Sequence, residues 1–69
     1  MKTPTQEKLE AQRGQDIKQI VTEALETHRG KFAALRASME LEISDATLYS
    51  WCREYGIAVE DYTIGAEGE

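Results

Sequence analysis

Apolar residues recur at helical spacing in the segment that follows Asp16. They fall at positions i, i+3, i+4, i+7 and i+8, so one face of a helix carries all of them. These residues are Ile17, Ile20, Val21, Ala24 and Leu25. Such a stripe is typical of a helix that packs on a core, and Gly30 marks where that helix stops. We predict a core helix here that ends near His28.

We expect this helix to begin well upstream of its apolar stripe. Thr3 can cap a helix whose first position is Pro4, and Gln6 stands where the partner in a capping box belongs. The stretch that follows is polar up to Gln15, and Gly14 costs about 1 kcal/mol inside a helix. The pattern therefore predicts one long first helix whose polar first half either frays or needs a partner.

A second, short helix is predicted over residues 31–39, before a connection formed by residues 40–43. Its large apolar side chains are spaced to share one face, and its small side chains allow a neighbouring helix to approach closely. The large residues are Phe32, Leu35 and Met39, and the small ones are Ala33, Ala34 and Ala37.

The third predicted helix runs from about Asp45 to Tyr55. Ser44 offers an N-cap, and the charge of Asp45 suits the first turn of a helix. Gly56 supplies the left-handed residue that ends the helix, and Ile57 can complete the apolar contact of this C-cap. The inward stripe consists of Leu48, Trp51, Cys52 and Tyr55.

The C-terminal part of the chain gives no regular pattern. We predict irregular structure for residues 58–64 and a disordered acidic tail for residues 65–69, so the single domain covers residues 1–64. A chain of 69 residues has a thin core, and a second copy often supplies the missing stability. We therefore predict a homodimer, with an interface formed by apolar residues that lack obvious partners: Leu9, Val59, Tyr62 and Ile64.

The composition limits the classes of function that this protein can have. With 41% hydrophobic and 30% charged residues the chain reads as soluble, and no apolar run approaches the roughly 18 residues of a membrane span, so no membrane partner is expected. The amino terminus lacks a signal-like apolar core, and one unpaired cysteine fits a reducing compartment, so we expect a cytoplasmic protein. One histidine and one cysteine give no metal-binding set, and no catalytic motif is visible. We predict no cofactor, no small-molecule substrate and no enzymatic activity.

Charge changes the picture of possible partners. Eight Lys and Arg stand against thirteen Asp and Glu, which gives a net charge of -5. Such a charge repels a phosphate backbone. The acidic side chains are either a solvated surface that keeps a small protein soluble or a face that docks on a basic partner.

The run from Ile43 to Gly56 reads ISDATLYSWCREYG. It resembles the helix-turn-helix of insertion-sequence transposase DNA-binding subunits, in which a Thr-Leu-Tyr-x-Trp helix ends in Tyr-Gly, and it is similar to the Fis-type unit. The resemblance covers Ile17 to Ile57 and is tightest from Leu41 to Gly56. It implies an all-α, three-helix, homeodomain-like helix-turn-helix domain. With the long first helix and the homodimer predicted above, this completes the expected fold.

Two features depart from that family. Glu42 stands where the family has its turn glycine, so a left-handed turn there would be strained. The face of the third helix that would read DNA offers Arg53 as its one basic residue, beside Glu54. Both departures make DNA binding doubtful.

In its length, its acidity and this helix-turn-helix unit, the chain is similar to phage-encoded quorum-sensing anti-activators. That resemblance implies a protein that binds and inhibits a LuxR-type transcriptional activator of the host, with a pilus-assembly ATPase as a further partner. The candidate partner-binding residues are Ala46, Tyr49, Ser50 and Arg53, since Tyr and Arg are enriched in interface hot spots. The alternative is a small sequence-specific DNA-binding transcriptional regulator, which the transposase-like motif itself favours.

Overall fold

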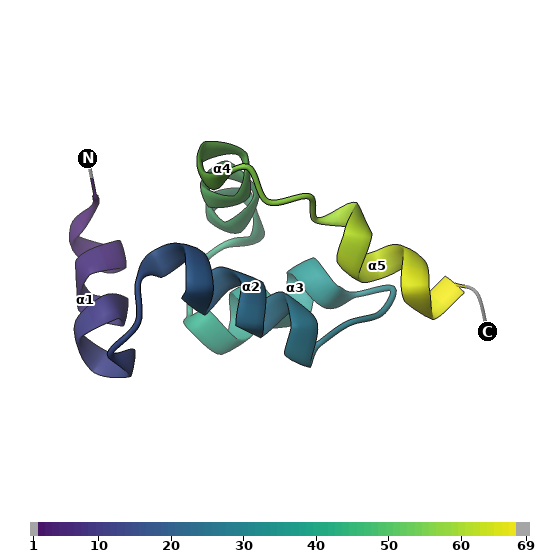
Figure 1. The fold of residues 1–69 in the computed structure, drawn as a ribbon, viewed down its shortest axis with the longest axis horizontal. Helices are drawn as coiled ribbons and strands as arrows, with labels where there is room; N and C mark the ends of the chain where they lie inside the picture. The colour runs from purple at the N-terminus through teal and green to yellow at the C-terminus, as the bar shows by residue number, and fades with distance from the viewer. Residues whose placement is uncertain (1, 68–69) are drawn as a thin grey trace.

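The computed structural model describes the backbone of residues 2–67 and the side chains of residues 2–63. These residues form five helices and no strand: α1 (Pro4–Arg13), α2 (Ile17–Thr27), α3 (Ala33–Leu41), α4 (Asp45–Tyr55) and α5 (Glu60–Glu67). The prediction of an all-α fold is confirmed. The molecule is elongated, with α1 and α5 at opposite ends and α2, α3 and α4 between them (Figure 1).

The predicted long first helix is wrong, because the chain breaks between α1 and α2. The capping box of Thr3 and Gln6 starts α1 as expected. Gly14 then adopts a left-handed conformation with φ 65° and ends α1, and its N–H donates to the carbonyl of Glu10. Asp16 starts α2 anew, since its side chain accepts a hydrogen bond from the Gln19 N–H at 2.9 Å.

Helix α2 carries the predicted stripe into the core. All five of its apolar stripe residues are buried, and the helix packs on α1, α3 and α4. Helices α3 and α4 also pack on each other, so these three helices enclose the centre of the core. Leu48, Trp51 and Cys52 are buried as predicted, and Tyr55 is half-buried against them.

Helix α3 begins and ends two residues later than the predicted segment 31–39. Its small residues Ala33, Ala34 and Ala37 face the core and permit close approach, as predicted. Its large residues Leu35 and Met39, with Phe32 at the N-cap, do share a face, but that face is exposed to solvent. Glu42 ends the helix in a left-handed conformation with φ 60°, and the Ile43 N–H donates to the Ser38 carbonyl at 3.0 Å.

The prediction of irregular structure over residues 58–64 is wrong from Glu60 onward, where α5 begins. The helical backbone continues to Glu67, so residues 65–67 also differ from the predicted disordered tail, whereas residues 68 and 69 lie outside the described part of the chain. Long-range contacts hold α5. Arg29 donates to the Asp61 carbonyl at 3.0 Å and lies over the Tyr62 ring, and the Gly30 N–H donates to the Tyr62 carbonyl.

The proposed dimer residues find partners within the chain. Leu9 belongs to the buried core at 7% exposure, and Val59 and Tyr62 pack against that core half-buried. The side chain of Ile64 lies outside the described residues. The argument that these four residues lack partners is therefore wrong for Leu9, Val59 and Tyr62.

Candidate functional site

One face of α4 points away from the core and carries all four residues predicted to bind a partner. Ala46, Tyr49, Ser50 and Arg53 stand at i, i+3, i+4 and i+7, and each is exposed. Tyr49 keeps 46% of its surface accessible, which is high for an aromatic residue. We call these four residues the α4 surface.

Local sequence fixes the helix that presents this surface. The Ser44 hydroxyl accepts a hydrogen bond from the Thr47 N–H at 3.1 Å, and the Asp45 carboxylate accepts one from the Ala46 N–H at 2.9 Å. At the other end Gly56 is left-handed, and the Ile57 N–H donates to the Cys52 carbonyl at 2.8 Å. Because both ends are capped and the opposite face is buried, the α4 surface is held on a rigid element.

The chemistry of the α4 surface is suited to contact. Tyr49 offers an apolar ring with a hydroxyl, Ser50 a hydroxyl and Arg53 a guanidinium. The acidic residues Asp45 and Glu54 are exposed on the same helix, so the charge of Arg53 is outweighed locally. This mixture can dock on a surface that is partly basic and partly apolar.

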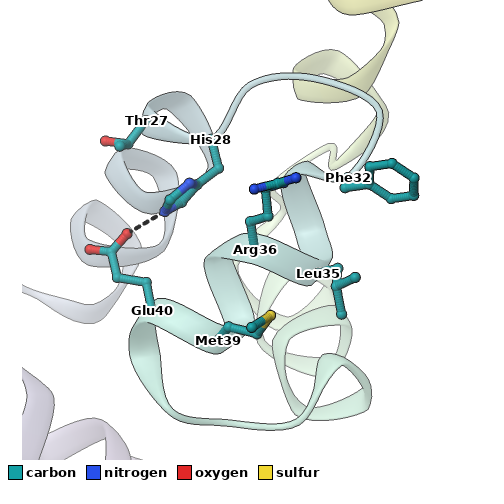
Figure 2. A pocket seen from close by; sticks show the side chains of 7 residues that line it. All are labelled: Thr27, His28, Phe32, Leu35, Arg36, Met39 and Glu40. Carbon is teal, nitrogen blue, oxygen red and sulfur yellow. Dashed lines mark hydrogen bonds and ion pairs between the residues drawn. The ribbon is translucent and has the colours of Figure 1, made fainter.

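A second exposed surface lies on α3 and its N-cap residue. We call Phe32, Leu35 and Met39 the α3 surface; their exposed fractions are 51%, 49% and 68%. They stand beside an open hollow of about 850 Å³, which also involves Thr27, His28, Arg36 and Glu40 (Figure 2). The signal in the sequence was the row of small residues on the opposite face of α3, which marks the side that approaches α2 and α4.

Three ionisable side chains, two of which line this hollow, tie helices together. Glu40 accepts a hydrogen bond from Arg13 at 3.3 Å through one oxygen and contacts the His28 Nε2 at 2.8 Å through the other. The three residues come from the ends of α1, α2 and α3. Because these three side chains contact one another, we interpret them as structural links between the helices.

The cysteine is not available for surface chemistry. Cys52 is 2% exposed, and burial raises the pKa of its thiol, so the reactive thiolate is disfavoured. Within the described residues, no group of three or more His, Cys, Asp or Glu side chains is placed to hold a metal ion. In the same part of the chain, every helix is too short or too polar to cross a membrane.

Comparisons with known proteins add no relative. No protein-family model matches the chain, and neither curated proteins nor solved structures give a significant match.

Proposed function

We propose that this chain is a small interaction protein that binds a protein of its host and inhibits it through the α4 surface. The observation that carries this proposal is the exposure of Tyr49 and Arg53, one turn apart, on a rigid helix whose remaining charges are acidic. Tyr and Arg supply much of the binding energy in protein interfaces, because they combine large contact area with directional hydrogen bonds.

Charge favours a protein partner over DNA. A protein that holds DNA typically neutralises several phosphates with Lys and Arg. The α4 surface offers one basic side chain, with Asp45 and Glu54 beside it, in a chain of net charge -5. Electrostatics therefore oppose approach to a phosphate backbone and favour approach to a basic protein surface.

The partner that we propose is a LuxR-type transcriptional activator, with a pilus-assembly ATPase as a second one. The support is the similarity of the sequence to phage-encoded quorum-sensing anti-activators, together with the acidic charge. A transcriptional activator must carry a basic surface to bind DNA, and an acidic protein can occupy that surface. We further propose that the domain is a three-helix helix-turn-helix formed by α2, α3 and α4, that it works in the cytoplasm and that it forms a homodimer.

The binding test uses matched alanine variants. Purified wild-type chain should retain a LuxR-type activator in a pull-down and lower its affinity for operator DNA. Tyr49→Ala and Arg53→Ala should lose both effects while keeping the helical circular dichroism of the wild type. Lys18→Ala removes an exposed cation from α2 and serves as the control, which should behave as wild type. Retained activity in both α4 variants would contradict the proposed site.

The second candidate function is a sequence-specific DNA-binding regulator. The observation that favours it is the arrangement of α3, a short turn and α4, with Arg53 exposed on the second helix. Salt dependence separates the two candidates, because phosphate contacts make affinity fall steeply as salt rises. Micromolar binding to duplex DNA at physiological salt, with such a slope, would support this second function and contradict the first.

A further inference from the structure

The α3 surface is a row of apolar side chains that the described residues of the chain leave largely exposed. Phe32, Leu35 and Met39 stand at i, i+3 and i+7 and are each about half exposed or more. Contiguous exposed apolar side chains of this size mark interaction sites more often than isolated ones do. Since Tyr49 does not line the hollow beside them, this surface is a separate feature from the α4 surface.

The shape of this region fits a helix better than a small molecule. The hollow is open to solvent, whereas a small ligand is typically buried over most of its surface. Phe32 and Met39 are seven positions apart, which is about 10 Å along a helix axis. Two turns of a docked helix present anchors at i, i+3 or i+4, and i+7 over the same distance.

The charges around the α3 surface indicate which kind of partner helix would bind there. Arg36 and Lys31 are exposed beside it, and no carboxylate in the described chain forms a salt bridge with either. Glu40, the acidic residue that lines the hollow, is already engaged by Arg13 and His28. Figure 2 shows the Arg36 guanidinium between His28 and Phe32. This surface is therefore locally basic on an acidic protein.

A second copy of the chain fits this surface poorly. Residues 32, 35 and 39 are centred close to Leu35, so a two-fold pairing of α3 with itself would place the neighbouring Arg36 of one copy near Arg36 of the other. Two guanidinium groups brought together in this way repel each other. A partner with carboxylates at this position meets no such penalty.

We propose that the α3 surface is a docking site for an acidic amphipathic helix of another protein. The apolar side chains of that helix cover Phe32, Leu35 and Met39, and a carboxylate on its flank pairs with Arg36. The protein thus has two binding surfaces with opposite preferences: α4 takes a basic partner and α3 takes an acidic helix. Such an arrangement allows two different proteins to be engaged by one small domain.

The experiment uses two designed peptides of about 16 residues, long enough to form a helix. Both carry Leu at i, i+3, i+4 and i+7; one has Glu on its flanks and its twin has Lys. Fluorescence anisotropy should show the Glu peptide binding the full chain about tenfold tighter than the Lys peptide. Arg36→Glu should reverse that preference, Leu35→Ser should weaken both peptides, and the control Lys18→Ala on α2 should change neither.

Three results would overturn the proposal. The first is failure of the Glu peptide to approach saturation at about 100 µM. The second is equal binding of both peptides with no response to Arg36→Glu. The third is a wild-type dimer in sedimentation that Leu35→Ser converts to a monomer, because a second copy would then occupy the surface. Since none of these measurements involves the α4 surface, their outcome is separable from the test of the proposed inhibition.

Discussion

Glu42 is the one residue other than glycine with positive φ in the described chain, and it stands at the turn between α3 and α4. A left-handed conformation costs a residue with a Cβ about 1 to 2 kcal/mol. The Glu42 side chain is exposed, so its packing contributes little free energy to offset that cost. The turn nevertheless forms, because the hydrogen bond from Ile43 to Ser38 and the burial of Leu41 and Leu48 on either side determine it.

We predict that Glu42→Gly stabilises the domain by about 0.5 to 1 kcal/mol, since glycine adopts this conformation without strain but loses more entropy on folding. Thermal unfolding followed by circular dichroism measures it. The matched control is Gly56→Ala. Its added Cβ would meet no atom within 4 Å, so conformational strain alone should lower stability by about 1 kcal/mol. A less stable Glu42→Gly protein would show that the carboxylate itself holds the turn.

Glu10 links the two helices that the sequence suggested were one. Its carboxylate accepts hydrogen bonds from the Lys2 ammonium at 2.6 Å and from the Ile17 N–H at 2.7 Å. The bond from Lys2 is the larger cause that holds the pKa of Glu10 below its ordinary value of 4.5. A carboxyl whose pKa is lowered by folding stabilises the fold above its unfolded pKa, and this contribution is lost as pH falls through the folded pKa.

Glu10→Gln should therefore lower the melting temperature at pH 7, and the difference from wild type should shrink as pH falls below 4.5. Melting curves at neutral and acid pH give the comparison. Lys2→Met removes the donor and should reproduce part of the neutral-pH loss. If Glu10→Gln melts as wild type does at pH 7, the carboxylate does not link α1 to α2.

At the scale of elements, the sequence predicted α4 and the buried face and C-terminal end of α2 well, because each helix combines a clear apolar stripe with local end signals. The sequence also carries local signals for the break before α2. Gly14 suits a helix end, Asp16 suits an N-cap, and the apolar stripe starts at Ile17. The prediction of one long helix places Gly14 inside that helix, and the break was missed for this reason. The start of α5 carried a weaker local signal, the two acidic residues of its first turn, and its position depends on contacts from Arg29 and Gly30 to residues 61 and 62, about 30 residues away in sequence.

The candidate site was partly predictable for the same reason. The exposed face of α4 follows from the spacing of its buried residues, so Tyr49 and Arg53 could be placed without a structure. The exposure of Phe32, Leu35 and Met39 could not be read from hydrophobicity, which favours burying large apolar side chains. Close packing against α2 and α4 instead selected the alanine face of α3.

Helix α4 allows scaffold and site to be tested independently. Leu48→Ala and Trp51→Ala each remove a large buried side chain, which typically costs about 2 to 5 kcal/mol, and should unfold so small a domain. Tyr49→Ala and Arg53→Ala alter exposed positions and should change the melting temperature little. Circular dichroism melts of the four variants make the comparison. Unfolding by Tyr49→Ala would assign that ring to the scaffold.

At the scale of the whole molecule, charge is distributed unevenly over an elongated domain. The net charge is -5, yet Lys31 and Arg36 gather near the α3 surface while Asp45 and Glu54 flank the α4 surface. The two surfaces lie on α3 and α4, which pack on each other in the middle of a molecule of 38 by 19 by 18 Å. The overall acidity speeds approach to basic proteins and slows approach to nucleic acid, and both effects weaken as salt rises.

The most direct test of the proposed inhibition follows labelled operator DNA by fluorescence anisotropy while it is bound to the DNA-binding domain of a LuxR-type activator. On titration with the wild-type chain at physiological salt, we predict that the anisotropy falls to the value of free DNA, because the chain occupies the activator and does not bind DNA itself. Titration with the Arg53→Ala variant should leave the anisotropy at the value of the activator–DNA complex. Anisotropy that stays unchanged, or that rises as the chain adds to the DNA, would contradict the account.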